Sequence, residues 1–329
     1  MGLPKKLTLA HLPTPVEKLE RLSVTLGKEL YLKRDDFTGM ELSGNKVRKL
    51  EFALQEALEQ GAKVLITCGG LQSNHARATA VAARKLGLDC HLVLRGRPQG
   101  PDHGNLLLDQ LLGCTFTFME PEDFNDGHLQ VMATLKAAYD EKGTPAYLLP
   151  MGASNAIGTF GYAAAYEEIR LQEDTLEAPF DTIVCAVGSG GTHAGLVLGN
   201  MLGGSRHRVV GVPITDDSRL FRPIITQLTT ECLGRVAPGT PLPSEEITFL
   251  DGYSGRGYAL NTPEEMAFIR RIAREEGVFL DPVYTGKAFR GLVTEIEENT
   301  GFFADSQRIL FVHTGGLYGL FPKSEEFLF

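Results

Sequence analysis

The chain contains few cysteines, no tryptophan and no excess of positive charge. An odd number of cysteines without a Cys-x-x-Cys pair argues against both a disulfide framework and a zinc site. Because 32 Lys and Arg residues are outnumbered by 41 Asp and Glu residues, the formal net charge of −9 argues against nucleic acid as a partner. We expect the following thiols to be buried and reduced: Cys68, Cys90, Cys114, Cys185 and Cys232.

The sequence also lacks long hydrophobic runs. No stretch of about 18 uncharged apolar residues occurs, and the first residues include no apolar leader core. These absences predict a soluble, cytoplasmic protein without a membrane partner. The 329 residues, of which 43% are hydrophobic and 22% charged, are enough for one large α/β unit or two domains, and the composition is not that of a disordered chain.

Helical and strand patterns alternate along the chain. Helices are predicted over residues 47–60, 74–86, 105–112, 129–141, 162–171, from 192, 263–276 and 286–298. Strands are predicted over residues 63–67, 91–94, 115–118, 146–149, 182–187, 208–212 and 308–312. This alternation predicts βαβ units with parallel strands. The segment 151–161, rich in glycine and small residues, is expected to be a crossover and a candidate hinge between two α/β series.

A glycine-rich loop directly follows the predicted strand 182–187 and opens the next helix. Its backbone N–H groups, uncovered by side chains at the glycines, predict a phosphate site formed by Gly188, Ser189, Gly190, Gly191 and Thr192. A dinucleotide site is the alternative, because Asp216 and Asp217 follow the next strand. His193 stands where that fingerprint needs its third glycine, which weakens the NAD interpretation.

Two further loops could carry chemistry. Lys46 lies in the first turn of a helix, where the positive end of the helix dipole lowers the pKa of an amine and favours Schiff-base chemistry. An ordinary solvated lysine is the alternative. The loop 68–75 offers backbone N–H groups beside a hydroxyl, an amide and an imidazole, a set that suits a carboxylate. Here the alternative is a plain capped turn, with Ser73 or Asn74 as the cap.

Taken together, the motifs resemble the fold-type II pyridoxal-phosphate enzymes, the tryptophan-synthase-β-like group, and within it the branch of D-cysteine desulfhydrase and aminocyclopropane-carboxylate deaminase. The matching runs cover nearly the whole chain: Pro13–Pro15, Tyr31–Asp36, Ser43–Glu51, Gln72–His75, Gly188–Gly195, Asp281–Lys287 and His313–Gly316. The resemblance implies two open, twisted α/β sheets in a homodimeric enzyme. It also implies a large cofactor-binding domain of residues 1–46 plus 156–329 and a small domain of residues 47–155.

The resemblance also implies roles for individual residues. Lys46 carries pyridoxal 5′-phosphate covalently and is the first candidate for the base, and Lys49 helps the glycine-rich loop to hold the phosphate. Asn74 bonds the pyridoxal 3′-oxygen, while Ser73, Asn74 and His75 receive the substrate carboxylate, and Ser73 takes part in proton transfer. The two tyrosines that approach the substrate correspond to Tyr258 and Tyr284, and Tyr258 fits this role better than Tyr253.

One departure separates members of the branch. The aminocyclopropane-carboxylate deaminases have a glutamate against the pyridine nitrogen where this chain has Thr285, and a carboxylate there keeps the ring a strong electron sink. With Thr285 and Thr314 as neutral partners, loss of a good β-leaving group is favoured over opening of a cyclopropane. His75, where the deaminases have glutamine, favours the same conclusion.

The sequence therefore predicts a lyase that converts D-cysteine to pyruvate, hydrogen sulfide and ammonia. Within the branch, L-cysteate sulfo-lyase and aminocyclopropane-carboxylate deaminase are alternatives, and the first would use Arg256 to pair with a sulfonate. A solvated Arg256 is the simpler interpretation. From other classes, the alternatives are an NAD-dependent oxidoreductase and a protein that binds pyridoxal phosphate without turnover.

Overall fold

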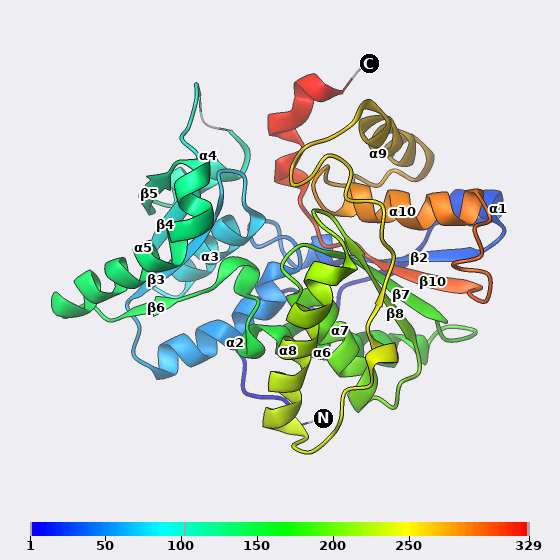
Figure 1. The fold of residues 1–329 in the computed structure, drawn as a ribbon, viewed down its shortest axis with the longest axis horizontal. Coiled ribbons are helices and arrows are strands. Elements are labelled where there is room, and N and C mark those ends of the chain that lie inside the picture. Colours follow the sequence, from blue (N-terminus) through cyan, green and yellow to red (C-terminus); the bar gives the residue numbers. More distant parts are fainter. Residues whose placement is uncertain (1, 102, 328–329) are drawn as a thin grey trace.

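The computed structural model describes residues 2–101 and 103–327 and contains two separate β-sheets. Figure 1 shows the smaller sheet on the left and the larger one on the right. The smaller sheet has the strand order β5-β4-β3-β6, and the larger one has the order β1-β2-β10-β7-β8-β9. The strands are β1 (Val16–Lys18), β2 (Glu29–Lys33), β3 (Val64–Gly70), β4 (Asp89–Arg95), β5 (Thr115–Met119), β6 (Ala146–Leu148), β7 (Thr182–Val187), β8 (Arg208–Pro213), β9 (Thr248–Phe249) and β10 (Arg308–Val312).

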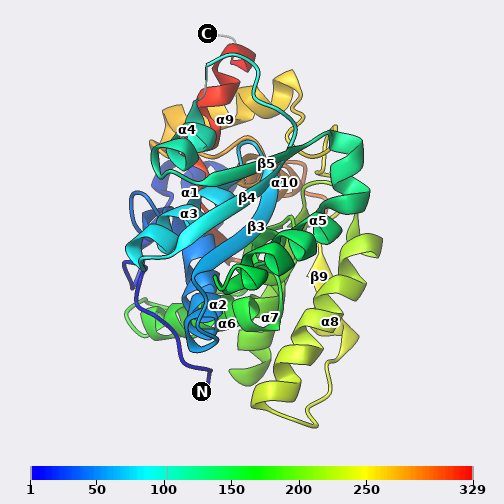
Figure 2. The ribbon, with the colours of Figure 1, turned by 90° about the vertical axis from the view of Figure 1, so that its left-hand side faces the viewer.

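Helices cover both faces of each sheet, which gives each part three layers (Figures 1 and 2). In the smaller part, α3 and α5 pack on the sheet; in the larger part, α1 and α10 lie on one face, and α6 and α7 pack against each other on the other face. The helices are α1 (Glu20–Leu26), α2 (Lys46–Glu59), α3 (Asn74–Lys85), α4 (Gly104–Leu111), α5 (Pro121–Glu141), α6 (Ala156–Glu173), α7 (Gly191–Leu202), α8 (Ser218–Val236), α9 (Pro263–Glu276) and α10 (Thr285–Glu297).

Buried strands explain the continuous apolar runs in the sequence. Along β3, Leu65 packs with α2 and α3, whereas Ile66 faces the α5 side with Phe124. Along β7, Val184 faces the α10 side and Cys185 the α7 side. Because both faces of these parallel strands are covered, every position is apolar or small, and the period of two is visible only in the structure. Apart from β1, which is antiparallel to β2, all paired strands are parallel, as predicted.

The predicted crossover over residues 151–161 is wrong in its second half. Helix α6 begins at Ala156, and the Asn155 side chain caps its first turn. Gly161 faces α2 so closely that an added Cβ would lie 2.5 Å from the carbonyl carbon of Arg48. The small residues therefore allow two helices to pack closely and do not form a hinge.

Other predicted elements agree with the structure to within a few residues, but some elements were not predicted. The sequence analysis assigned nothing before residue 46, where β1, α1 and β2 lie, and missed α8 and β9 altogether. Helix α5 begins at Pro121 rather than at residue 129. Apolar residues at helical spacing mark α8, but a proline at position 223 interrupts the pattern.

The strands divide between the sheets at points close to the predicted domain limits. The smaller sheet uses residues 64–148, and the larger sheet uses residues 16–33 and 182–312. Helix α2 contacts both α3 and α6, so the limits at residues 46/47 and 155/156 stay a prediction. Figure 2 shows α2 beneath the smaller sheet and beside α6. Among the described residues, no helix is long and apolar enough to cross a bilayer.

A buried ion cluster fixes α2 to its surroundings. The Arg48 guanidinium, 2% exposed, donates to both carboxylate oxygens of Asp35 at 2.8 Å and to both of Glu168 at 2.9 and 3.0 Å. Lys33 also donates to Glu168, and the Tyr162 hydroxyl donates to Asp35. The cluster thus connects the start of α2 to β2 and to α6. Its arginine, Arg48, lies two positions after Lys46 on the same helix.

We expect Arg48→Met to lower the free energy of unfolding by about 3–5 kcal/mol, because it leaves the buried Asp35 carboxylate without its counter-charge and Glu168 with Lys33 alone. Urea unfolding measured by circular dichroism checks this value. The control is Arg97→Met, which removes an exposed arginine paired with Glu120 and is expected to cost about 1 kcal/mol or less. Equal losses in the two variants would show that the cluster contributes no more than a surface pair.

Candidate active site

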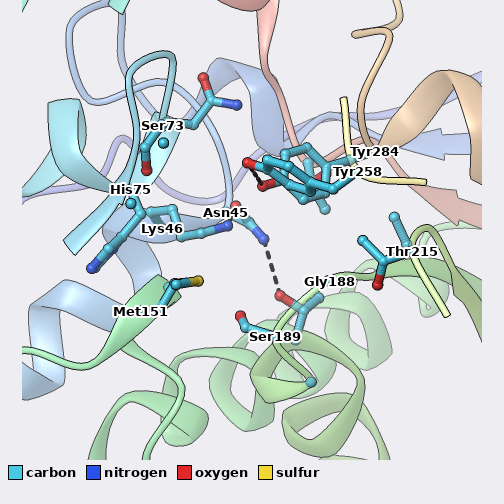
Figure 3. A pocket seen from close by; sticks show the side chains of 18 of the residues that line it. Asn45, Lys46, Ser73, His75, Met151, Gly188, Ser189, Thr215, Tyr258 and Tyr284 are labelled. Atoms are coloured by element: carbon cyan, nitrogen blue, oxygen red, sulfur yellow. Dashed lines mark hydrogen bonds between the residues drawn. The ribbon is translucent and has the colours of Figure 1, made fainter. Parts of the chain in front are cut away.

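The loops that leave the carboxyl ends of strands from both sheets enclose a cavity of about 250 Å³ (Figure 3). Strands β3, β4, β7, β8 and β10 all end at it. The lining residues are Asn45, Lys46, Gly69, Gly70, Ser73, Asn74, His75, Arg95, Phe124, Asn125, Met151, Gly152, Ala186, Gly188, Ser189, Gly190, Thr192, Thr215, Tyr258, Tyr284, Thr314 and Gly315. The structure thus brings together three loops that the sequence analysis had singled out separately.

Lys46 is the first residue of α2 and reaches into the cavity beside Asn45 (Figure 3). Its Nζ donates to Asn45 Oδ1 at 2.8 Å and lies 5.7 Å from the centre of the Tyr284 ring. Burial lowers the pKa of Lys46 to about 8; the charge of Asp281 opposes this shift and that of Arg77 adds to it. The direction of the shift agrees with the sequence prediction, although burial is its main cause. A larger share of neutral, nucleophilic amine is therefore present near neutral pH.

Asn45 connects the lysine to the glycine-rich loop. Its Oδ1 accepts from Lys46, and its Nδ2 donates to Thr192 Oγ1 at 3.0 Å. Thr192 is buried in the first turn of α7. The amide thus fixes the distance between the reactive amine and the start of α7.

The start of α7 forms a small polar cradle. Ser154 Oγ lies 2.7 Å from Ser189 Oγ, accepts from Lys49 Nζ at 2.7 Å and accepts from the Gly191 N–H at 3.3 Å. A Cβ added at Gly191 would lie 2.6 Å from Lys49 Nζ, so a side chain there would displace the Lys49 amine from the cradle. Gly190, with φ +88°, makes the turn into the helix.

Lys49 fits a bound phosphate. Its amine is buried, and its one hydrogen-bond partner among the described residues is Ser154; none of their carboxylates forms an ion pair with it. Burial, and then the charge of Lys46, hold its pKa well below the usual value. An anion beside it and at the α7 N-terminus would restore its charge, and the phosphate of pyridoxal phosphate is such an anion. The structure therefore makes Lys49 a stronger candidate than the sequence did.

The loop between β3 and α3 contributes the second group of polar atoms. Ser73 caps α3 by accepting from the Ala76 N–H at 3.1 Å, which leaves its hydroxyl hydrogen free to donate. Asn74 Oδ1 accepts from Asn105 Nδ2 at 3.0 Å, so its own amide N–H groups remain for a ligand. Gly69 gives Ser73 its space, since a Cβ there would lie 2.5 Å from Ser73 Oγ. Both predicted residues line the cavity, and their individual roles stay predictions.

The group of His75 that can bind a carboxylate is its backbone N–H, not its imidazole. Thr67 Oγ1 donates to the Leu149 carbonyl and therefore accepts from His75 Nε2–H at 2.8 Å. Burial, and then the charges of Lys46 and Lys49, hold the pKa of His75 well below its usual value. The imidazole is neutral and its one N–H is used. The imidazole therefore cannot donate to a carboxylate, and the backbone N–H of His75 in the first turn of α3 is the donor that remains.

The two predicted tyrosines meet across the cavity from Lys46. Tyr258 and Tyr284 are 26 positions apart, yet their hydroxyl oxygens are 2.9 Å from each other and their rings meet edge to face (Figure 3). Burial raises the pKa of both hydroxyls, so both are protonated. Tyr253 instead donates to Glu295 outside the cavity. The choice of Tyr258 over Tyr253 agrees with this placement.

Thr285 requires a correction. Its hydroxyl is fully buried, accepts from the Asp281 N–H at 2.8 Å and donates to Asp281 Oδ1 at 2.7 Å, and it does not line the cavity. The Asp281 carboxylate also accepts from the backbone N–H of Tyr284. The pair therefore holds the start of α10 and the Tyr284 backbone and does not face a cofactor ring. Of the two threonines predicted to do so, Thr314 lines the cavity.

Arg256 is exposed and lies outside the cavity lining. The solvated interpretation thus agrees with its position. Several lining residues were missed by the sequence analysis as site residues: Asn45, Arg95, Phe124, Asn125, Met151 and Thr215, together with Ser154 of the cradle. Ser154 lies in the small-residue segment that was taken for a hinge.

Comparison with known proteins agrees with this geometry. A family model described as pyridoxal-phosphate dependent enzyme matches residues 7–315. The chain belongs to this family. The fold-type II α/β class and pyridoxal phosphate as cofactor are confirmed, and the NAD-dependent alternative is set aside. His193, which weakened that alternative, is fully buried against Phe249.

Relatives within the family share most of this chain. A mitochondrial bifunctional D-cysteine desulfhydrase/1-aminocyclopropane-1-carboxylate deaminase of Arabidopsis thaliana is 43% identical over 97% of this chain and 80% of its own length. A D-cysteine desulfhydrase of Yersinia pestis is 41% identical over 96% of this chain and 95% of its own. A crystal structure of an ACC deaminase homologue is 36% identical, with a TM-score of 0.88 over 99% of this chain and 95% of the other.

We expect Lys49→Met to weaken binding of pyridoxal phosphate to the cofactor-free protein about tenfold to hundredfold, because charge-assisted hydrogen bonds to the phosphate are lost. Titration followed by the visible absorbance of the bound cofactor measures this change. Pyridoxal, which lacks the phosphate, is expected to bind both proteins equally. The control variant is Lys142→Met at an exposed position. If Lys49→Met weakened the binding of pyridoxal as strongly as that of pyridoxal phosphate, the substitution would act on folding rather than on phosphate recognition.

Proposed function

We propose that the protein is a pyridoxal-phosphate-dependent carbon–sulfur lyase that eliminates the β-substituent of D-cysteine as hydrogen sulfide, after which water hydrolyses the released enamine to pyruvate and ammonia. Relatives named D-cysteine desulfhydrase and covering nearly the whole chain support this assignment. Aminocyclopropane-carboxylate deaminase is the second candidate, because other relatives with similar identity carry that name.

One observation favours elimination over cyclopropane opening. None of the described residues that line the cavity is acidic, and Thr314 offers a neutral hydroxyl. A carboxylate against the pyridine nitrogen would keep that nitrogen protonated and strengthen the electron sink. Without it, the site suits a substrate that already has a good leaving group on its β-carbon.

The chain's own residues supply the remaining chemistry. The bound cofactor would provide the electron sink for loss of the α-proton. Lys46, with its lowered pKa, is placed to accept that proton, and the N-terminal turn of α3 with Ser73 is placed to hold the substrate carboxylate. Because Tyr258 and Tyr284 share one hydrogen bond, one O–H of the pair stays free to donate to the departing group.

The experiment is product analysis with the purified holoenzyme and five compounds: D-cysteine, L-cysteine, L-cysteate, β-chloro-D-alanine and aminocyclopropane-carboxylate. We expect pyruvate and sulfide from D-cysteine at a higher kcat/KM than 2-oxobutyrate from the cyclopropane. Lys46→Ala is expected to abolish both. Faster formation of 2-oxobutyrate would reverse the assignment, and no keto acid from any of the compounds would indicate a binder without turnover.

We further propose a cytoplasmic homodimer. All five cysteines are free, as expected in a reducing compartment. Large apolar side chains are exposed outside the cavity lining, Met40 at 77% and Leu111 at 74% among them. Their segments meet, because Tyr318 donates to the Met40 carbonyl and α4 contacts the turn at Leu317. Such an apolar surface favours self-association. Light scattering is expected to give twice the 35.9 kDa chain mass, and a single-chain mass would exclude the dimer.

A further inference from the structure

One cationic side chain of the cavity is not needed to bind the cofactor or the substrate α-carboxylate. Lys46 is the attachment point for the cofactor, Lys49 lies in the phosphate cradle, and the α3 N-terminus can receive a carboxylate. Arg95 also lines the cavity and has no assigned anion. None of the lining residues that the structure describes carries a negative charge to neutralise it.

The backbone of Arg95 is fixed in a β-sheet, whereas its side chain has no hydrogen-bond partner among the described residues. Arg95 is the last residue of β4 and lies opposite Gly70 of β3 in the parallel pairing, beside the loop that carries Ser73. Its guanidinium is exposed and makes no hydrogen bond or ion pair with the described residues. The neighbouring Arg97, in contrast, is paired with Glu120 at 2.7 Å.

Arg95 shares the cavity with the two tyrosines. Burial raises the pKa of Tyr258, and the positive charge of Arg95 is among the influences that lower it, as expected for two groups that face the same space. A substrate whose amine is at Lys46 and whose carboxylate is at Ser73 would direct its β-substituent into the remaining volume. The tyrosine hydroxyl pair and Arg95 border that volume.

We propose that Arg95 is a specificity-determining residue through which the same site also accepts amino acids with an acidic group on the β-carbon, such as a sulfonate or a carboxylate. This proposal rests on the proposed function, since it concerns the same cavity and the same amine and carboxylate positions. A guanidinium suits these groups because its planar N–H donors match two oxygens of a sulfonate or carboxylate. Arg95 thus takes the part that the sequence analysis considered for Arg256.

The test compares two amino acids of equal shape. Aspartate and asparagine, each as both enantiomers, differ in the charge of the group on the β-carbon and need not turn over. Their binding to the holoenzyme is measured by the change in cofactor absorbance at low salt. We expect the better-bound aspartate enantiomer to bind Arg95→Gln about tenfold more weakly than wild type, and asparagine to change less than about twofold. Arg95→Lys is expected to recover part of the loss.

Arg97→Gln is the matched control, because it removes an arginine two positions away that does not line the cavity. Equal weakening of aspartate and asparagine in Arg95→Gln would place this arginine at the α-carboxylate and overturn the proposal. No change in either ligand would also overturn it, as would a selective loss in Arg256→Gln instead. The wild-type product analysis is separate: absence of pyruvate there would refute the lyase function, while the aspartate-to-asparagine comparison would still decide the role of Arg95.

Discussion

The ion cluster around Arg48 is the interaction on which the geometry of the site depends. Its guanidinium joins the carboxylates of Asp35 and Glu168, which come from the larger part of the molecule, to the first turns of α2. Lys46 lies two positions earlier on the same helix. Because a buried, fully hydrogen-bonded arginine has one favourable arrangement, α2 cannot rotate or slide without breaking several short charge-assisted bonds. The reactive amine is thus positioned by contacts that never touch a ligand.

Close approach of backbones is the second constraint. Gly161 lets α6 contact the α2 backbone, and Gly191 leaves room for the Lys49 amine at the start of α7. Gly44 lies against the Thr314 carbonyl, so that the loop before α2 meets the loop after β10. In each case a methyl group would fill space that the site needs. Gly161 and Gly191 therefore serve packing and ligand access, whereas Gly44 also has the positive φ that favours glycine.

Within the described part of the chain, the side chains that line the cavity carry positive charge and no negative charge. Lys46 and Arg95 line the cavity, whereas no acidic side chain among the described residues does. The Asp281 carboxylate accepts hydrogen bonds from backbone N–H groups and from Thr285 at the start of α10. Such a cavity suits a ligand with several negative groups, as a phosphorylated cofactor with an amino-acid carboxylate would be. It also keeps Lys46 less basic than a solvated lysine, because both burial and nearby positive charge disfavour the ammonium.

The sequence by itself determined the α/β class and the loops that meet at the site, because these depend on local patterns: apolar periodicity, a glycine-rich turn after a strand, and a lysine at a helix start. The cofactor family followed from the resemblance of its motifs to known enzymes. Only the tertiary structure decided which side chains face the cavity. Thr285 and Thr314 are equally plausible in the sequence, yet a hydrogen bond to Asp281 removes the first from the site. Arg95 gives no local signal, since its role depends on the end of β4 lying beside Gly70 and near Tyr258. Such contacts join residues far apart in the chain, and no short-range pattern records them.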